Sequence, residues 1–426
     1  MRVLYVSATD VKGGRFNGYS LVEAQDAIAG LSAEMAVWRK ESDRDDVHEL
    51  RRGAVRWGHA VTWRVSQPLG LDGLLGLGGA ALLRLPSFSA ADLIHLQVTH
   101  NGPFFSVAWL MRLARLKPVV WTIHDMWPMT GTCRHSAECD KWLDGCRGRC
   151  PRPIGRSPLD NYSPALLWQA KRLVYSRSSC RLVVASEWTR SRVERSPLLR
   201  RFPLTQIPFG VDLDVFSPAH REAARQELGL AADDFAIAFR GVADDRDNVK
   251  GMAWLRRALR SLGADLPITL LIVDDGSAFV DLQGSFRVRT MGWLGERALS
   301  RALAAADVFI VPSEQESFCL MAVEAMAAGT PVVAFEGTAA AEIIYPPEGG
   351  LTVPAGDAAG IAAAVESLVR DEGLRGGLRR SARLLAEREY GFDTYVSRHL
   401  ALYEAALAAQ VASSREHRYL RGRASR

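Results

Sequence analysis

The chain has 426 residues, of which 48% are hydrophobic and 24% charged, and its formal net charge is +5. This composition is typical of a globular protein with two domains of roughly 200 residues each, and it excludes fibrous and low-complexity chains. The slightly basic balance suits a protein that meets phosphate groups or an anionic membrane surface, and it identifies neither.

No targeting or membrane-spanning segment is expected. The opening residues, MRVLYVSATD, contain too short an apolar run for a signal peptide, and no apolar stretch of about 20 residues follows. The glycine-rich run at 68–85 contains Asp72 and five glycines, so we interpret it as a loop and a helix near the core. Six cysteines in a chain of this length do not make a disulfide framework, and we therefore expect reduced thiols in a cytoplasmic protein.

The first half of the chain alternates between strand-like and helical segments. A β-branched and aromatic run at 2–7 predicts a buried parallel strand, a glycine turn follows it, and 18–31 has helical spacing. Further strands are predicted at 92–97, 118–123, 181–185 and 205–209. A strand, a glycine loop and a helix together open a doubly wound α/β fold.

A second series of strands and helices follows Pro218. Strands are predicted at 235–239, 268–273, 287–291, 308–311 and 331–335, and helices at 251–262, 296–305, 320–328 and over most of 358–409. The predicted class is therefore α/β, with two Rossmann-like, doubly wound parallel sheets. We place the domains at 1–212 and 213–388, a C-terminal helix returning to the first domain at 389–410, and a basic tail at 411–426.

The most informative stretch is PSEQESFCLMAVEAMAAGTPVV, at 312–333. Glu316 is expected in the loop between a strand and a helix, and Glu324 in the second turn of that helix. Such a helix N-terminus at the carboxyl edge of a sheet suits a diphosphate, and a carboxylate beside it can accept hydrogen bonds from sugar or ribose hydroxyls. Two glutamates eight residues apart are by themselves usually just solvated, so the surrounding residues carry the argument.

These residues resemble the donor signature of the retaining glycosyltransferases of family four, which have the GT-B fold, with the two domains facing a cleft. The resemblance implies that Glu316 contacts donor sugar hydroxyls and that Glu324 binds the nucleotide ribose. It also implies that the backbone at Phe318, Cys319 and Leu320 meets the sugar and the phosphate. The family usually has Phe-Gly where this chain has Phe318-Cys319, and this departure bears on the choice of donor sugar.

Other segments extend the resemblance over nearly the whole chain. IPFGVDLDVFSP, at 207–218, is similar to the interdomain hinge, which makes the first domain the acceptor side and the second the nucleotide-sugar-binding domain. Lys250 is similar to the lysine that grips the donor diphosphate, where a fixed cation stabilises the leaving group. Gly13 and Gly14 are similar to the first-domain glycine loop that approaches donor phosphate and acceptor.

An expected arginine is missing from the donor loop. Many family members carry an arginine directly after an upstream glycine, and here Gly241 is followed by Val242. Arg240 and Arg246 are the two candidates to replace it. Arg246 is the less favoured because aspartates surround it.

Thr122-Ile123-His124-Asp125 is expected at the end of a strand, on the active edge of the first sheet. There His124 can reach the cleft, with Asp125 to orient its imidazole. A histidine at a strand end is more often structural, but the family carries one that faces the reaction centre. The resemblance therefore implies a catalytic set of His124, Glu316 and Lys250.

A cysteine loop follows this motif. Cys133, Cys139, Cys146 and Cys150 have the spacing C-x5-C-x6-C-x3-C, which can form a structural zinc site; two disulfides or free thiols are the alternatives. A similar loop after His-Asp occurs in the exopolysaccharide and colanic-acid type of glycosyltransferase, where its position suggests a lid on the acceptor side.

The resemblance implies transfer of a sugar from a UDP- or GDP-linked donor to the hydroxyl of a glycan or lipid-linked acceptor, with retention of configuration. No cofactor is required for catalysis in this mechanism. The expected setting is cell-surface polysaccharide or lipopolysaccharide biosynthesis at the inner face of the cell membrane. The basic tail is expected either as a solvated, partly disordered end or as an anchor for anionic lipid. A nucleotide-sugar epimerase or hydrolase on the same fold is the alternative. Nucleic-acid binding explains little of the chain, and no strand is followed by the G-x-G-x-x-G of a dehydrogenase.

Overall fold

The structure is a computed structural model that describes residues 1–12, 14–66, 74–100, 104–151, 163–242, 245, 249–263 and 266–424, with side chains to 412 in the last helix. The chain divides into two compact units. The first contains Met1–Ala185, Thr189–Ile207 and Val396–Arg426, and the second contains Ser186–Trp188 and Pro208–Tyr395. The main segment of the second unit is therefore Pro208–Tyr395. The sequence predicts that this domain begins at 213 and that the returning helix begins at 389.

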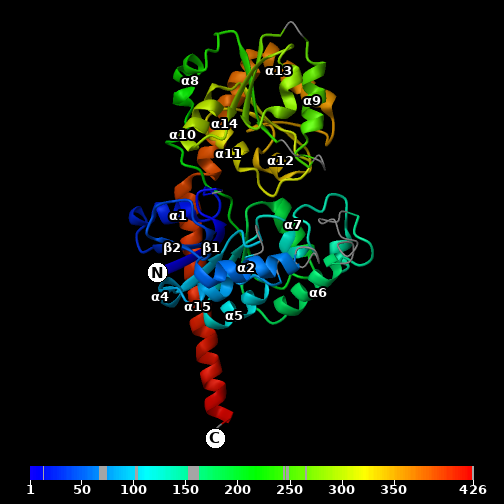
Figure 1. Cartoon of the computed structure of the whole chain (residues 1–426). Helices are drawn as coiled ribbons and strands as arrows, with labels where there is room; N and C mark the ends of the chain where they lie inside the picture. Colours follow the sequence, from blue (N-terminus) through cyan, green and yellow to red (C-terminus); the bar gives the residue numbers. More distant parts are fainter. Residues whose placement is uncertain are drawn as a thin grey trace. The chain divides into compact units, whose positions relative to one another are not determined.

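The first unit is built on a parallel sheet in which the described strands have the order β3-β2-β1-β4-β5-β6-β7 (Figure 1). Its strands are β1 (Arg2–Thr9), β2 (Ser32–Arg39), β3 (Val47–Glu49), β4 (Leu93–Leu96), β5 (Val119–Thr122), β6 (Arg181–Val184) and β7 (Leu204–Gln206). Its helices are α1 (Tyr19–Glu23), α2 (Gly53–Ser66), α3 (Gly78–Leu82), α4 (Pro86–Ala90), α5 (Ala108–Leu116), α6 (Ser163–Tyr175), α7 (Glu187–Arg195) and the main part of α15 (Phe392–Ala424).

The second unit has its own parallel sheet, with the described strands in the order β10-β9-β8-β11-β12-β13 and helices on both faces (Figure 1). Its strands are β8 (Phe235–Gly241), β9 (Ile268–Asp274), β10 (Arg287–Gly292), β11 (Val308–Val311), β12 (Val332–Phe335) and β13 (Gly350–Val353). Its helices are α8 (Arg221–Glu227), α9 (Met252–Ser261), α10 (Glu296–Ala305), α11 (Leu320–Ala327), α12 (Ala339–Ile343), α13 (Ala358–Arg370) and α14 (Glu372–Glu389). Two parallel α/β sheets confirm the predicted fold class.

The helix predicted at 18–31 is wrong in its length. The structure has α1 up to Glu23 and then a short 3-10 turn at Gln25–Ala27. After the helix, Oε1 of Gln25 accepts a hydrogen bond from the backbone of Ala33, 2.9 Å away, and its Nε2 donates to Asp46 at 2.8 Å. These contacts join the segment to the edge of the sheet.

Three strands, β2, β3 and β13, have no counterpart in the sequence prediction. β2 includes Glu34, a charged residue that weakens the apolar pattern of a buried strand. In the structure Glu34 Oε2 lies 2.6 Å from Nε2 of His48 on the neighbouring strand β3, so the charge has a partner across the sheet. Strand pairing, rather than local pattern, makes this segment a strand.

Each sheet reverses its strand order at one point. In the first sheet the order reverses between β1 and β4, and in the second between β8 and β11. Loops that leave adjacent strands at such a point diverge to opposite faces of the sheet, and the crevice between them is where ligands bind in open α/β folds. The loops after β8 and β11 contain Lys250 and Glu316, and the loops after β1, β4 and β5 contain Gly14, Gln97 and His124.

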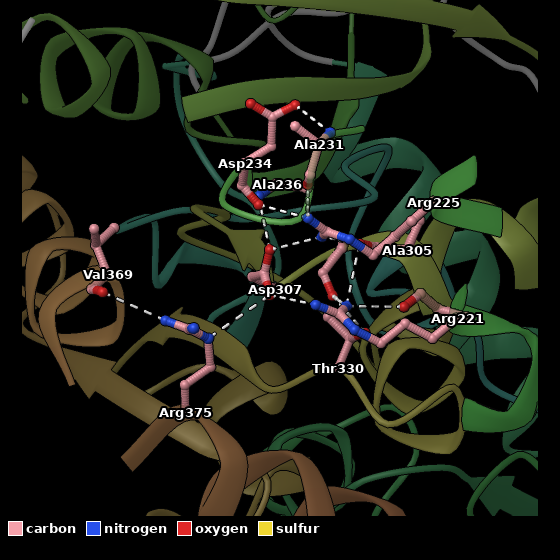
Figure 2. A network of polar contacts seen from close by, with 12 residues as sticks. Arg221, Arg225, Ala231, Asp234, Ala236, Ala305, Asp307, Thr330, Val369 and Arg375 are labelled. Carbon is pink, nitrogen blue, oxygen red and sulfur yellow. Dashed lines mark hydrogen bonds and ion pairs between the residues drawn. The ribbon is translucent and has the colours of Figure 1, made fainter. Parts of the chain in front are cut away.

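A buried ionic network lies at the opposite end of β11 (Figure 2). Asp307, directly before β11, accepts from Arg221 at 2.6 Å, Arg225 at 3.2 Å and the backbone N–H of Ala236 at 2.8 Å. Arg221 also donates to the carbonyls of Ala304, Ala305 and Ala306, which are left without intrahelical donors at the C-terminus of α10. The network ties α8 and α10 to the start of the central strand.

Among the described residues, no helix combines the length and the apolar character that crossing a membrane requires.

Candidate functional site

The second unit brings Lys250 and Glu316 together, although 66 residues separate them in sequence. Lys250 Nζ donates to Glu316 Oε1 at 2.6 Å, and Ser313 Oγ donates to the same oxygen at 3.0 Å. The Glu316 side chain is largely buried, and that of Lys250 is one-third exposed. The pair therefore places a cation next to a carboxylate that can accept hydrogen bonds from hydroxyl groups, at the carboxyl end of the sheet.

Backbone contacts fix this pair. The N–H of Glu314 donates to the carbonyl of Val249 at 3.0 Å, so the loop after β11 lies directly against the loop after β8. Gly251 makes the approach close, because it has a left-handed φ of 72° and a Cβ added there would lie 1.7 Å from the carbonyl oxygen of Pro312. A side chain at 251 would push the two loops apart.

Asp245 is a further residue of this loop that the sequence motifs do not identify. Its carboxylate accepts from the backbone N–H groups of Lys250, at 2.9 Å, and Met252, at 3.0 Å. It therefore positions the lysine and caps the start of α9. No sequence signal identifies it, because Asp245 is seven residues before α9 and a capping aspartate normally stands directly before the first helical residue.

Helix α11 begins directly after Cys319, which has a left-handed φ of 77°. This conformation costs a non-glycine residue about 1–2 kcal/mol, which explains why glycine is usual at this position in the family that the sequence resembles. Burial, followed by the charge of Glu316, raises the pKa of the Cys319 thiol well above its ordinary value. The thiol therefore stays protonated and is unsuited to act as a nucleophile.

We expect Cys319→Gly to raise the free energy of unfolding by about 1 kcal/mol, because glycine adopts a φ of 77° without the Cβ clash. Urea denaturation followed by circular dichroism measures it. Cys180→Ser is the matched control, since Cys180 is a buried cysteine that does not have a positive φ. A Cys319→Gly protein no more stable than wild type would contradict the strain.

Glu324 lies in the second turn of α11, as the sequence predicts, and is fully buried. Phe318, at the other end of this segment, packs edge to face against Phe209 with ring centroids 5.1 Å apart, and also against Tyr390 at 6.1 Å. These aromatic contacts hold the loop that leads into the helix. The first N–H groups of α11 have no intrahelical acceptors, which is the arrangement that binds phosphate oxygens.

Of the two arginine candidates for the donor loop, the structure describes Arg240 alone. Arg240 is at the end of β8, and its Nε lies 2.5 Å from Asp274 Oδ2 at the end of β9. Arg246 lies outside the described residues, and so does Gly13.

Beside Asp274 the structure has an open cavity of about 550 Å³ that the motifs do not predict. Its lining combines the exposed ring of Trp293 with hydrogen-bonding groups, and consists of Asp274, Asp275, Gly276, Ser277, Val280, Thr290 and Trp293.

In the first unit, His124 follows β5, at the carboxyl edge where the sequence places it. Its Nε2 lies 2.7 Å from Oε1 of Gln97, and Phe16 packs against its ring with centroids 5.4 Å apart. Burial lowers the pKa of His124 to about 4, so the imidazole is neutral at pH 7. A neutral ring can accept or donate a proton, but it has no positive charge with which to stabilise the diphosphate.

The expectation that Asp125 orients His124 needs correction. The Asp125 carboxylate lies 2.8 Å from Nε2 of His100 and accepts the backbone N–H of Trp127 at 2.9 Å. His100 in turn stacks on the Trp127 ring. Gln97, directly after the adjacent strand β4, is a hydrogen-bond partner of His124 that the sequence motifs do not predict.

Gly14 forms the turn after β1. Its N–H donates to the carbonyl of Val11 at 2.9 Å, and its own carbonyl accepts from Ser20 at 3.2 Å. A Cβ at this position would lie 3.0 Å from the ring of Tyr19 and 3.1 Å from the Val11 carbonyl. Glycine therefore lets the turn pack tightly against α1.

The cysteine loop is built around a buried lysine. Lys171 Nζ donates to the carbonyls of Trp127, Thr130 and Gly131 at 2.6, 3.0 and 3.0 Å, and burial lowers its pKa to about 7. The N–H of Gly131 donates to Cys146 Sγ at 3.3 Å. Burial and then the other three thiols of the loop raise the pKa of Cys133 to about 11, so the four sulfurs lie in one neighbourhood.

All four loop cysteines are free thiols in the structure. Within the part of the chain that the structure describes, no group of three or more histidine, cysteine, aspartate or glutamate side chains is arranged to hold a metal ion. The sulfurs would have to move together to bind zinc, and structural zinc therefore stays a prediction.

That prediction is tested by the zinc content of the purified protein. We expect stoichiometric zinc in the wild-type chain, and its loss together with a lower melting temperature when Cys133 and Cys150 are replaced by serine. The control is Cys180→Ser, a buried cysteine outside the loop. A metal-free wild-type protein would contradict structural zinc and leave the two alternatives, two disulfides or free thiols.

Two family models match the chain in succession. Residues 34–215 match a model described as Glycosyltransferase Family 4, and residues 234–371 match one described as Glycosyl transferases group 1.

Curated relatives carry related names. A D-inositol 3-phosphate glycosyltransferase of Arthrobacter sp. (strain FB24) is 34% identical over 49% of this chain and 51% of that protein. One from Saccharomonospora viridis is 28% identical over 93% of this chain and 90% of that protein. A phosphatidyl-myo-inositol mannosyltransferase of Mycobacterium leprae is 33% identical over 50% and 58%. The chain spans about half the length of the first of these relatives.

Solved structures share the fold at low sequence identity. A sucrose-phosphate synthase from Thermosynechococcus elongatus has a TM-score of 0.70 at 20% identity, and the match covers 96% of this chain and all of that one. HepE of Anabaena, solved with UDP and glucose, has a TM-score of 0.64 at 17% identity over 95% and 100%. WaaG, a glycosyltransferase involved in lipopolysaccharide biosynthesis, has a TM-score of 0.63 at 15% identity over 95% and 98%. The chain is therefore similar to a Glycosyltransferase Family 4 model over 34–215 and to a Glycosyl transferases group 1 model over 234–371, and it has the fold of the GT-B glycosyltransferases.

Proposed function

We propose that this protein transfers a sugar from a nucleoside diphosphate sugar, UDP- or GDP-linked, to an acceptor hydroxyl with retention of configuration. The observation that carries the proposal is the Lys250–Glu316 pair, 2.6 Å apart, in which Lys250 lies in the loop after β8 and Glu316 in the loop that leads into the N-terminus of α11. A diphosphate with an attached sugar requires a cation and the N–H groups of a helix for its phosphates. It also requires a carboxylate that accepts hydrogen bonds from the sugar hydroxyls.

The chemistry assigns each group one task. The bond between the sugar C1 and the diphosphate oxygen breaks, and the acceptor oxygen forms its bond to C1 on the same face. The acceptor proton goes to the departing phosphate oxygen. Lys250 and the α11 N-terminus stabilise the charge on the leaving group, while Glu316 holds sugar hydroxyls.

The remaining site residues bind rather than react. Glu324 is proposed to bind the ribose, and neutral His124 to line the reaction centre. Neither glutamate is proposed as a general acid or base, since the leaving group itself takes the proton. The solved complexes of HepE with UDP and with UDP-glucose support a nucleotide-sugar donor for this fold.

A screen of nucleotide sugars by thermal shift tests the proposal. At least one UDP- or GDP-sugar is expected to raise the melting temperature, and Glu324→Ala is expected to remove that shift. Glu366→Ala is the control, because Glu366 pairs with Arg370 on the exposed face of α13, away from the loops of the donor site. No stabilising donor, together with unchanged activity in Glu324→Ala, would end the proposal. Sugar release without an acceptor would favour the epimerase or hydrolase alternative.

We further propose that the acceptor belongs to cell-surface polysaccharide or lipopolysaccharide synthesis, as in the exopolysaccharide type of the family, and that the protein works at the inner face of the membrane. The phosphatidyl-myo-inositol mannosyltransferases among the relatives and WaaG support this setting by their names. Acceptor identity follows from a transfer assay with lipid-linked and free glycans and the donor found by the screen.

Helix α2 supports contact with a membrane surface. Trp57, Val61 and Val65 are 75%, 64% and 52% exposed, and their spacing of four residues places them on one face. Exposed Arg56 and Arg64 lie on the same helix, and no aspartate or glutamate occurs from 51 to 66. An apolar strip with a tryptophan and flanking arginines is typical of a helix that lies in the interface of an anionic bilayer.

We expect the protein to sediment with vesicles of phosphatidylcholine and phosphatidylglycerol, and far less with phosphatidylcholine alone. Arg56→Glu with Arg64→Glu is expected to lower the partition coefficient at least about tenfold, because each arginine contributes about 1 kcal/mol near such a surface. Trp57→Ala is compared with Trp293→Ala, an equally exposed tryptophan of the second unit. If only replacement of the tail arginines at 418, 421 and 423 reduces binding, α2 is not the contact.

A further inference from the structure

A chain of buried hydrogen bonds connects His124 with the C-terminal helix α15. Nε2 of His124 lies 2.7 Å from Oε1 of Gln97, and Nε2 of Gln97 lies 3.2 Å from Nε2 of His95. Nδ1 of His95 lies 2.7 Å from the hydroxyl of Tyr403, on α15. The last link joins Tyr403 to Tyr5 of β1 at 2.9 Å.

The inner members of this chain are shielded from water. Gln97 is 2% exposed, and His95, Tyr403 and Tyr5 are fully buried. They come from three elements. His95 lies in β4, and Gln97 directly follows that strand; Tyr5 lies in β1 and Tyr403 in α15. Because no water can substitute for a lost partner there, each proton in the chain must be placed by its neighbours.

The proton positions follow from the chemistry of an amide. An amide nitrogen only donates, so Nε2 of His95 accepts and carries no proton. Burial holds the pKa of His95 well below its ordinary value, and the neutral ring therefore has its proton on Nδ1, which donates to Tyr403. Thr122 Oγ1 lies 2.8 Å from Nε2 of His95 and can donate to the same nitrogen. A His95 ring protonated on Nδ1 in turn favours the amide nitrogen of Gln97, rather than its oxygen, at this position.

The other end of the same amide sets His124. A carbonyl oxygen only accepts, so Oε1 of Gln97 requires a proton on Nε2 of His124. The neutral imidazole then has no proton on Nδ1, so this nitrogen can accept a hydrogen bond but cannot donate one. A histidine in this tautomer accepts from a sugar or acceptor hydroxyl and does not donate to it.

We propose that Gln97 is a positioning residue that fixes His124 in its Nε2–H tautomer, and that the chain through His95 to Tyr403 fixes Gln97. The tautomer itself is a property of the folded first unit. Its catalytic consequence rests on the proposed sugar transfer, where Nδ1 of His124 would accept a hydrogen bond from a hydroxyl at the reaction centre.

Nitrogen NMR of the full chain labelled with ¹⁵N-histidine reads the tautomer directly, without any substrate. The His124 signals are assigned by their absence in His124→Asn. At pH 7 the wild-type ring is expected to show a protonated Nε2 and an unprotonated Nδ1. The opposite pattern, which follows if the Gln97 amide has the reverse orientation, overturns the proposal.

Substitutions of Gln97 separate positioning from structure. Gln97→Leu removes the acceptor and is expected to give a mixture of both tautomers of His124. Gln97→Glu keeps an acceptor of the same length and is expected to restore Nε2–H on His124, while the donor to His95 is lost. A Gln97→Leu protein that is folded and still shows a single Nε2–H tautomer overturns the role of Gln97.

A tyrosine pair tests the rest of the chain. Tyr403→Phe removes the acceptor of His95 and is expected to populate the second tautomer of His124, to a smaller extent than Gln97→Leu. The matched control is Tyr175→Phe, since Tyr175 is a buried tyrosine of the same unit whose hydroxyl has no hydrogen-bond partner among the described residues. An unchanged His124 in Tyr403→Phe overturns the link to α15.

The kinetic arm uses the donor found by the thermal screen. Gln97→Leu is expected to lower kcat about tenfold or more while KM for the donor stays near the wild-type value, because a misplaced proton affects the reaction and not donor binding. Failure to find any donor affects only the proposed function, since the NMR result stands without it. A changed tautomer with unchanged kcat overturns the catalytic consequence.

Discussion

Replacing Lys250 with alanine is expected to lower kcat for sugar transfer by about 10²–10³-fold, because one preorganised group that stabilises developing charge contributes on that scale. In the structure Asp245 and Gly251 fix the backbone around Lys250 at the carboxyl edge of the second sheet, and its ammonium group donates to Glu316 at 2.6 Å. The charge on the departing diphosphate grows as the sugar leaves, so a fixed cation acts mainly on the transition state. The rate with saturating donor and acceptor measures it.

Two further variants give the result its meaning. Lys250→Ala strands the largely buried carboxylate of Glu316, so Lys250→Ala combined with Glu316→Gln shows how much of the loss comes from that charge. Arg260→Ala removes an exposed cation paired with Asp281 elsewhere in the same unit and should leave the rate unchanged. Wild-type kcat in Lys250→Ala would remove the lysine from the mechanism.

Replacing Asp307 with alanine is expected to lower the free energy of unfolding by about 3–5 kcal/mol, the range found when one partner of a buried ion pair is removed. Asp307 is 3% exposed and is the carboxylate to which Arg221, Arg225 and Arg375 turn. Without it these guanidinium groups face each other at the base of β11 (Figure 2). Arg379 donates to the carbonyl of Ala306, which also accepts from Arg221. Burial already lowers the pKa of Arg379 to about 10, which shows how poorly solvated the cluster is.

Urea denaturation measures the effect, with Asp307→Asn and Asp281→Ala as comparisons. Asp307→Asn keeps the shape and an acceptor but loses the charge, so its loss of stability should be the smaller of the two at this position. Asp281 also has two arginine partners, Arg256 and Arg260, but on the surface, and its removal should change stability little. Equal losses for Asp307→Ala and Asp281→Ala would contradict the argument from burial.

The sequence prediction was most accurate where a repeating local pattern decides the structure. The predicted bounds of 296–305 and 308–311 are those of α10 and β11. It was wrong at 18–31, where the Gln25 side chain bonds to Ala33 and Asp46 and the helix stops early. It missed β2 because Glu34 interrupts the apolar pattern, and only the neighbouring strand supplies His48 as its partner.

The donor site shows the same division. The composition of 312–333 places Glu316 before a helix and Glu324 within it, and the alternation of strands and helices places both at the carboxyl edge of a parallel sheet. Those features depend on residues within one or two turns of each other, so the sequence by itself determines them. The fold class follows from the same local features.

Only the tertiary structure decided which side chains act together. Lys250 donates to Glu316. Gln97, rather than Asp125, forms a hydrogen bond with His124, and Asp307 pairs with arginines from α8 and α14. Each of these contacts joins residues from different strands or helices, and the pairing depends on the order in which the strands assemble and on backbone turns such as Gly251. No periodicity along the chain encodes such distances, because they are set by packing between elements that lie far apart in the sequence.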